Sequence, residues 1–210
     1  MNNSLKSITN NALKSLKNYN PIYDEQWKYT NIKNFSKFNL SSQKLYNKVD
    51  KKYADTDNII IINNVLQNKQ KLSPQINISS LKHAIKHNLN NCGSIFNQII
   101  PNDKNKFILY NTAYFQTGNY FYFKQNSKID EPIYINNIIE QTDSKSFFNN
   151  RFLFHFDKNC SAKIILTELN TSKISSNIIY ELYLEKNSNI EFIIESNKPE
   201  TTQILNFGST

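Results

Sequence analysis

Histidine is scarce in this chain of 210 residues, so few side chains could bind a metal through an imidazole ring. His83 and His87 stand four residues apart in His-Ala-Ile-Lys-His, a spacing that places both rings on one face of a helix. The glutamate that a zinc protease places beside its first histidine is absent here. We therefore expect a solvated helix face at this pair and no catalytic zinc.

Two cysteines are present, Cys92 and Cys160, too far apart in sequence for a Cys-x-x-Cys pair and too few for a disulfide framework. This usage favours a reducing compartment. Cys160 follows His155 and stands near Asp157 and Lys158, whose charges can alter the pKa of a thiol. We expect Cys160 to be a small turn residue all the same, and Cys92 to be a small residue of the core or of a helix end.

Carboxylates on the later segments form a third candidate group, made up of Glu168, Glu181, Glu191 and Glu195. Enzymes that cleave polysaccharides use paired carboxylates, and Glu191 and Glu195 have the same parity along one segment. We interpret all four as part of a solvated outer face with occasional lysine pairing. The three glycines, Gly93, Gly118 and Gly208, are too dispersed for a phosphate-binding loop. The sequence therefore assigns no catalytic, cofactor-binding or metal-binding residue.

The net charge of +8 suggests nucleic-acid binding, but the composition explains it in another way. The chain contains 35 Asn, 28 Ile and 24 Lys, residues encoded by codons rich in A and T, and Arg151 is its single arginine. The lysines are scattered, whereas base readers usually rely on arginine forks. The longest apolar run is Ile59 to Ile62, far short of a membrane span. We expect neither a nucleic acid nor a membrane as partner.

Residues 1–106 read as a small α/β region with amphipathic helices. Leu5, Ile8, Leu13 and Leu16 share one face of a helix that ends before Asn20-Pro21. We expect Trp27 and Tyr29 to anchor this helix on a core.

The second part of this region contains a β-branched run at Ile59–Ile62, which predicts a buried strand followed by a turn at Asn63-Asn64. Residues 75–78 predict a second strand. Residues 79–100 predict a helix capped by Ser79 or Ser80 and divided at Gly93.

Residues 107–210 read as a series of short strands with no long helical pattern between them. The candidate strands cover residues 119–124, 132–137, 151–156, 162–167, 177–184, 190–195 and 203–207. Three turns repeat a pattern of two polar residues, Asn, then Ser or Cys, with Asn126, Asn159 and Asn187 in equivalent places. Stacked strand-turn units of this kind indicate a solenoid, and Asn tolerates a left-handed turn where glycine is scarce. We predict a mainly β protein with a right-handed parallel β-helix as a single-stranded solenoid. A β-sandwich is the alternative for this half.

Several motifs resemble those of SufD-type Fe–S cluster assembly proteins. They are Glu25-Gln-Trp-Lys-Tyr-Thr30, Leu109 to Phe115 followed by Gly118 to Phe123, Glu131-Pro-Ile-Tyr-Ile135, Arg151 to His155 with Ala162 to Ile165 and Glu168, and Asn177 to Glu181. The motifs follow the family's order over residues 25–207, which is nearly the whole chain.

The resemblance implies an N-terminal α/β region followed by a right-handed parallel β-helix. It also implies a non-catalytic scaffold subunit that works with a SufB-type paralogue and a SufC-type ABC ATPase in iron–sulfur cluster assembly and transfer. The cluster would be handled transiently by the complete complex, with no cofactor on this chain, in bacterial cytoplasm or a plastid-type stroma. Family members are about twice as long, so the β-helix of residues 107–210 is expected to be truncated. The family's functional segments lie beyond it, and no functional residue is carried over.

Three other readings stay open. The chain could be the SufB-type paralogue, although a short N-terminal region favours SufD. It could be a β-helix enzyme acting on a polysaccharide through Glu168, Glu191 and Glu195. A basic nucleic-acid binder would show steep salt dependence.

Overall fold

The structure is a computed structural model that describes residues 3–18, 57–67, 73–100, 106–115, 117–140, 147–170, 175–197 and 203–209. The expected anchors Trp27 and Tyr29, the Asn20-Pro21 helix end and the motif at residues 25–30 lie outside these residues.

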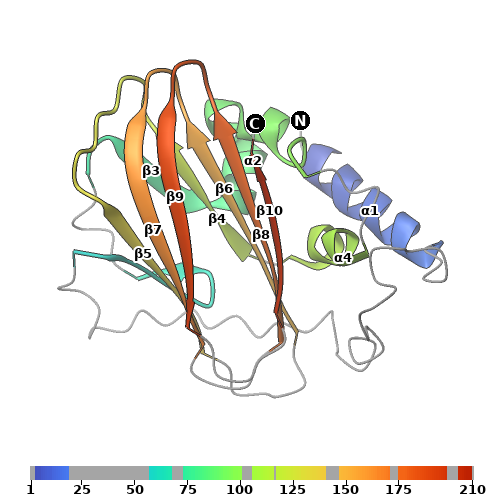
Figure 1. The fold of residues 1–210 in the computed structure, drawn as a ribbon. Helices are drawn as coiled ribbons and strands as arrows, with labels where there is room; N and C mark the ends of the chain where they lie inside the picture. Colours follow the sequence, from blue (N-terminus) through green and yellow to red (C-terminus); the bar gives the residue numbers. More distant parts are fainter. Residues whose placement is uncertain are drawn as a thin grey trace.

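Two five-stranded sheets make up about half of the described chain (Figure 1). The first sheet has the order β2 (Val65–Leu66), β1 (Ile59–Ile62), β5 (Ile133–Ile139), β7 (Ser161–Asn170) and β9 (Asn189–Asn197). The second has the order β10 (Gln203–Ser209), β8 (Ser175–Leu184), β6 (Phe147–Phe156), β4 (Thr117–Phe123) and β3 (Ile76–Ser80). From β4 to β10 the chain alternates between the two sheets, so each return to a sheet adds one strand beside the last.

Parallel pairing dominates both sheets. β1, β5, β7 and β9 pair in parallel, as do β4, β6, β8 and β10, while β2 and β3 add one antiparallel pair each. The β-sandwich considered as the alternative for residues 107–210 agrees with two sheets that pack on a shared core, but the parallel pairing differs from the antiparallel strands typical of that architecture. The mainly β class is confirmed, and an observed strand overlaps every predicted strand segment. β6 to β10 extend beyond their expected limits, while the bounds of β4 and β5 are shifted by one or two residues.

The core lies between the two sheets, because alternate residues of each strand point inward. Aromatic side chains stack from strand to strand in the second sheet: the rings of Phe121 and Phe154 are 4.5 Å apart, and those of Phe152 and Tyr180 are 5.0 Å apart. Phe154 also meets Phe192 of the first sheet edge-on at 5.0 Å. Neither sheet could bury this surface alone, so the stacked units stabilise one another.

A helical layer covers the outer side of the second sheet (Figure 1). It consists of α1 (Asn3–Lys17), α2 (Leu81–His87), the short 3-10 helix η5 (Leu89–Asn91), α3 (Cys92–Ile95) and α4 (Lys106–Tyr114). The expected amphipathic helix is α1. Its Leu5 and Ile8 pack against the hydrophobic cluster formed by side chains of α2, α3, β4 and β6. Among the described residues, no helix is both long and apolar enough to cross a membrane.

The predicted helix over 79–100 is confirmed at its start and differs at its break. Ser80 caps α2 by accepting a hydrogen bond from the His83 amide at 3.3 Å. The break falls at Asn88, Asn90 and Asn91, which all have positive φ, and not at Gly93, which lies inside α3. Asparagine tolerates this left-handed backbone almost alone among residues with a side chain, so it ends the helix as glycine usually does.

Helix α4 was not expected, since residues 107–118 showed no helical pattern. Its apolar side chains lie on several faces, and its buried residues include Asn111 and Thr112 together with Phe107 and Leu109. A helix that buries polar side chains has no clear apolar stripe, which removes the periodic signal.

Gly118 is required by a close approach of two strands. A Cβ at this position would lie 2.2 Å from the backbone oxygen of Arg151 on the neighbouring strand β6. Only glycine lets the backbones of β4 and β6 meet at this spacing.

Candidate functional site

The asparagine turns are the first polar feature that the strands position. Asn126, Asn159 and Asn187 have φ values of 63°, 60° and 63°, which confirms the left-handed turns expected from the repeat. Their side chains form a ladder: Asn187 Nδ2 donates to Asn159 Oδ1 at 3.1 Å, and Asn159 Nδ2 donates to Asn126 Oδ1 at 2.8 Å. We call these three residues the asparagine ladder. It fixes the register of successive turns.

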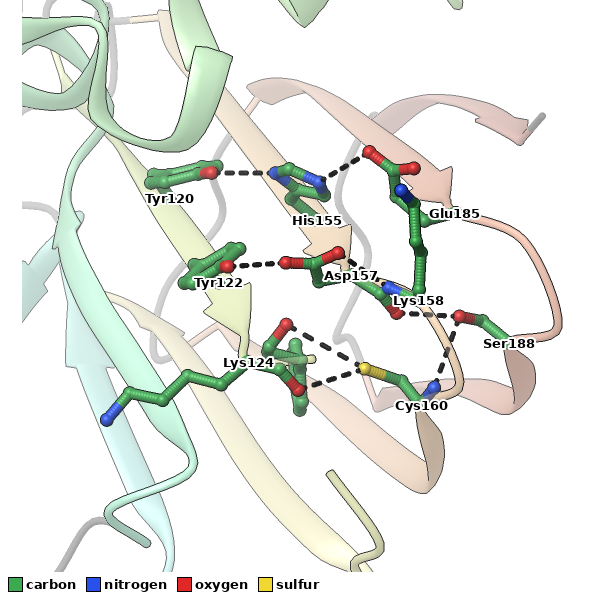
Figure 2. A network of polar contacts seen from close by, with 10 residues as sticks. Tyr120, Tyr122, Lys124, His155, Asp157, Lys158, Cys160, Glu185 and Ser188 are labelled. Atoms are coloured by element: carbon green, nitrogen blue, oxygen red, sulfur yellow. Dashed lines mark hydrogen bonds and ion pairs between the residues drawn. The ribbon is translucent and has the colours of Figure 1, made fainter. Parts of the chain in front are cut away.

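Cys160 lies in the second of these turns, as the repeat predicts, and is buried. Its thiol faces the backbone oxygens of Phe123 and Lys124 at 3.7 and 3.3 Å, and its amide donates to Ser188 Oγ at 3.3 Å (Figure 2). Burial raises the pKa of Cys160 and outweighs a lowering by hydrogen bonds from Ser127. A buried, protonated thiol is a poor nucleophile, so Cys160 is a packing residue here.

Cys92 is fully buried at the start of α3. Burial, and then the charge of Glu181, raise the pKa of Cys92 to about 12. The expectation of a small core residue at a helix end is confirmed.

The outer face of the second sheet carries a network around His155 (Figure 2). We call Tyr120, Tyr122, His155, Asp157, Tyr183 and Glu185 the His155 cluster. β4 supplies both of the first tyrosines, β6 ends just before Asp157, and β8 ends just before Glu185. Parallel register sets Tyr122 beside His155 and His155 beside Tyr183. The rings of these two tyrosines meet the imidazole edge-on, each at 5.2 Å.

Two sets of polar contacts connect the residues of the cluster. Tyr120 Oη lies 2.9 Å from His155 Nδ1, and His155 Nε2 lies 3.7 Å from Glu185 Oε1. Tyr122 donates its hydroxyl to Asp157 Oδ2 at 2.7 Å.

The pKa shifts in the cluster follow from burial and these contacts. Burial lowers the pKa of His155, against a smaller raising by Glu185 and Asp157. Burial, and then the hydrogen bond to Asp157, raise the pKa of Tyr122 to about 12. Burial alone would raise the pKa of Asp157, but hydrogen bonds from Tyr122 and the Lys158 amide outweigh it, and the net direction is down.

A second polar cluster joins the helical layer to the strands through Arg151, which is fully buried. Its Nε and Nη2 lie 2.7 and 2.6 Å from Glu181 Oε1, and its Nη1 donates to Thr112 Oγ1 at 2.7 Å. Nη2 also donates to Asn97 Oδ1 at 3.1 Å, and the guanidinium lies 4.4 Å from the centre of the Phe96 ring. We call this the Arg151 cluster. The sequence analysis assigned no role to Arg151. A single arginine among 24 lysines could have indicated a site that needs the planar, multidentate guanidinium group.

The four glutamates divide into two pairs. Glu191 and Glu195 are exposed on β9, and Glu191 pairs with Lys163 at 3.0 Å, which confirms a solvated face with lysine pairing. The same expectation is wrong for Glu168 and Glu181, which are buried.

The two buried glutamates are far from solvent for different reasons. Glu168 has the inward parity of β7 and accepts the Tyr180 hydroxyl from the opposite sheet. Glu181 faces outward, but the helical layer covers it and Arg151 neutralises its charge. This parity was available from the sequence for Glu168, whereas the covering of Glu181 depends on tertiary packing. With these carboxylates apart and buried, sugar cleavage through the proposed set of glutamates has no geometric support.

The histidine pair at α2 is exposed, with ring centres 4.4 Å apart. In the part of the chain that the structure describes, no group of three His, Cys, Asp or Glu side chains is placed to hold a metal ion. Tyr120 and His155 are 2% and 4% exposed, too little for a substrate to reach them, whereas Glu185 at the edge of the His155 cluster is 30% exposed.

These features define a class of protein: a stack of parallel strands with a helical layer, in which polar clusters bind neighbouring elements to one another. The family model of the SufBD protein N-terminal region matches residues 2–135. The chain therefore belongs to the SufB/SufD family. Comparison with curated proteins gives no match.

Proposed function

We propose that the chain acts as a non-catalytic, SufD-type scaffold subunit in iron–sulfur cluster assembly and transfer. The observation that carries this proposal is the family match over residues 2–135, joined to the order of SufD-like motifs that continues to residue 207. The motif at Gly118 lies where glycine is sterically required, and the motif at Arg151 lies in the buried cluster that attaches the helices. Two of the motifs thus include residues on which the fold depends.

The strand stack is, in this proposal, part of a right-handed parallel β-helix. Support comes from the alternation of β4 to β10 between two parallel sheets and from the asparagine ladder that aligns successive turns. We further propose the division at residues 106 and 107, with the first coils of the β-helix following the α/β region. A rigid stack of this kind presents its outer faces and strand edges for pairing with another protein.

The proposed partners are a SufB-type paralogue and a SufC-type ABC ATPase, in bacterial cytoplasm or a plastid-type stroma. The cluster is the cargo of the complete complex and has no ligand on this chain. The burial of both cysteines, of Tyr120 and of His155 supports a structural role.

Reconstitution tests this function. The chain is mixed without oxygen with SufB-type and SufC-type proteins from the same source, and the mixture is examined by size-exclusion chromatography with mass detection. We expect a complex that contains all three proteins. Failure to bind the SufB-type protein would contradict the scaffold proposal, and binding to a SufD-type protein instead would identify the chain as the SufB-type paralogue.

A further inference from the structure

The histidine pair of α2 lies on the solvent side of the helical layer. Leu81, Ala84 and Ile85 are the buried residues of this helix, whereas His83 and His87 are exposed. Residues four apart on a helix lie on the same face, one turn above each other. The two imidazole rings are accordingly neighbours, with their centres 4.4 Å apart and their planes inclined by 43°.

The backbone that carries the two rings is held at both ends of α2. At the start, Ser80 Oγ accepts a hydrogen bond from the His83 amide at 3.3 Å. At the end, Asn88 follows His87 in a left-handed conformation and its amide donates to two backbone oxygens of the helix. The two caps and the packed inner face therefore fix the backbone beneath both rings, so rotation of the two side chains is enough to bring a nitrogen of each ring together.

We propose that His83 and His87 form a two-imidazole site for a divalent transition-metal ion. Neutral imidazole is the commonest metal ligand in proteins and suits Ni²⁺, Cu²⁺ and Zn²⁺. Two imidazole nitrogens that share one ion at about 2.0–2.1 Å, the distance found for zinc, lie about 3 Å from each other. Rings whose centres are 4.4 Å apart bring one nitrogen of each within reach of that spacing.

The surroundings of the pair determine which ions it can take. Two imidazoles fill only part of a coordination sphere, so water completes it and the ion exchanges with solvent. Lys82 and Lys86 directly precede the two histidines, and the Lys82 ammonium lies 5.6 Å from the centre of the Phe115 ring. Both lysine charges oppose any cation, so binding depends on coordination by imidazole. Mg²⁺, which prefers carboxylates and water, should not bind.

Isothermal titration calorimetry tests the site with NiCl₂ at pH 7.5, on the full chain, freshly reduced and without a histidine tag. We expect one Ni²⁺ per chain and weaker binding of Co²⁺, in the order that imidazole ligands impose. Mg²⁺ should neither bind nor displace Ni²⁺. The third histidine, His155, is 4% exposed and so does not compete for the ion.

Binding should also stabilise α2, because the ion connects two successive turns of the helix. A ligand that binds only the closed helix reduces the open population by a factor of 1 + [L]/Kd. Free Ni²⁺ at about ten times Kd should therefore slow amide hydrogen exchange over residues 84–88 about tenfold. The same measurement on His83→Asn should show no slowing by Ni²⁺.

Two variants and a control on the same helix assign the binding to the pair. His83→Asn and His87→Asn each leave a single imidazole and should weaken Ni²⁺ binding at least about tenfold, since the second ligand no longer acts within the same molecule. Both side chains are exposed, so the variants should keep the fold. Lys86→Ala, an exposed control on α2, keeps both rings and should retain the binding.

The proposal is overturned if either histidine variant binds Ni²⁺ as tightly as the unmodified chain, or if the unmodified chain binds no Ni²⁺. Displacement of Ni²⁺ by Mg²⁺ would also overturn it, because a carboxylate site would then hold the ion. Unchanged exchange over residues 84–88 at saturating Ni²⁺ would place the bound ion away from α2 and contradict the proposal equally.

Discussion

Arg151 is the one arginine among 25 lysines and arginines, and it is fully buried. Its position explains why lysine does not replace it: three of its nitrogens reach Glu181, Thr112 and Asn97 at once while the flat guanidinium packs on Phe96. A lysine offers a single point of charge at the end of its stem and cannot make this set of contacts. Glu181, 0% exposed, depends on Arg151 for neutralisation.

Removing the guanidinium should therefore leave an uncompensated buried charge. We expect Arg151→Met to lower the free energy of unfolding by about 3–5 kcal/mol, measured by urea denaturation. The double variant Arg151→Met with Glu181→Leu should recover much of this loss, because no charge is left alone. A loss below about 1 kcal/mol for the single variant would show that the pair is not buried in solution.

The thiols give a second prediction at the residue scale. Because burial raises the pKa of both Cys92 and Cys160, the folded chain should react with iodoacetamide at pH 8 far more slowly than the chain in urea. Mass spectrometry of the alkylated protein measures this directly. Rapid labelling of Cys160 in the folded chain would contradict its packing against the backbone of Phe123 and Lys124.

At the scale of elements, the asparagine ladder takes the place of glycine turns. Both Asn159→Ala and Asn159→Gly lose the two side-chain hydrogen bonds of Asn159, each contributing about 0.5–1.5 kcal/mol. Asn159→Ala should cost about 1–2 kcal/mol more than Asn159→Gly, since only alanine pays the full penalty of a left-handed backbone. Thermal or urea unfolding would compare the two with Lys158→Ala, an exposed control in the same turn that should change stability by no more than about 0.5 kcal/mol. Equal losses for alanine and glycine would mean that backbone strain does not matter there.

The strands and the repeat could be predicted because their signals are local. Ile59–Ile62 and the segments after residue 117 show β-branched or aromatic runs, and the asparagine turns recur in equivalent places. Helix α4 could not be found in this way, because it buries Asn111 and Thr112 against the second sheet and so lacks an apolar stripe. Asn111 donates to the backbone oxygens of Asn150 and Asn177 at 2.7 and 2.9 Å, contacts that exist only once β6 and β8 are paired.

The candidate sites, like the helices, could be predicted from the sequence only in part. Sequence parity indicates that Glu168 points inward with Ile164 and Leu166, and only the assembled sheets reveal Tyr180 as its partner. The His155 cluster joins residues from three strands that are adjacent in space through parallel pairing. Its members are up to 65 residues apart in the chain, so no local motif could identify it.

For the whole molecule, the pKa shifts predict how stability depends on pH. The pKa of His155 is lowered on folding, so its contribution is present above 6.5 and is lost as the pH falls toward the folded value. Asp157, also lowered, adds a further loss below 3.8. Tyr122 is raised from 10.0 to about 12, so its contribution is present below pH 10 and is lost as the pH rises through that interval.

Cys92 and Cys160, whose pKa values are raised from 9.0, add an alkaline loss that begins near pH 9. Urea denaturation at a series of pH values should therefore give a plateau of stability between about pH 7 and pH 9, with a decrease on either side. Tyr122→Phe should reduce the alkaline decrease, and His155→Asn should flatten the decrease that begins near pH 6.5. If neither variant changed the decrease in the free energy of unfolding assigned to it, other groups would control the pH dependence.

The scaffold role is tested most directly by isolating the protein from its source cells under reducing, oxygen-free conditions and identifying what co-purifies with it. We expect the chain to be recovered with a SufB-type paralogue and an ABC-type ATPase, in a complex that dissociates when either partner is depleted. Recovery of the chain without either partner, at the same salt concentration and protein abundance, would contradict the proposed function and leave the family relationship as a statement of ancestry alone.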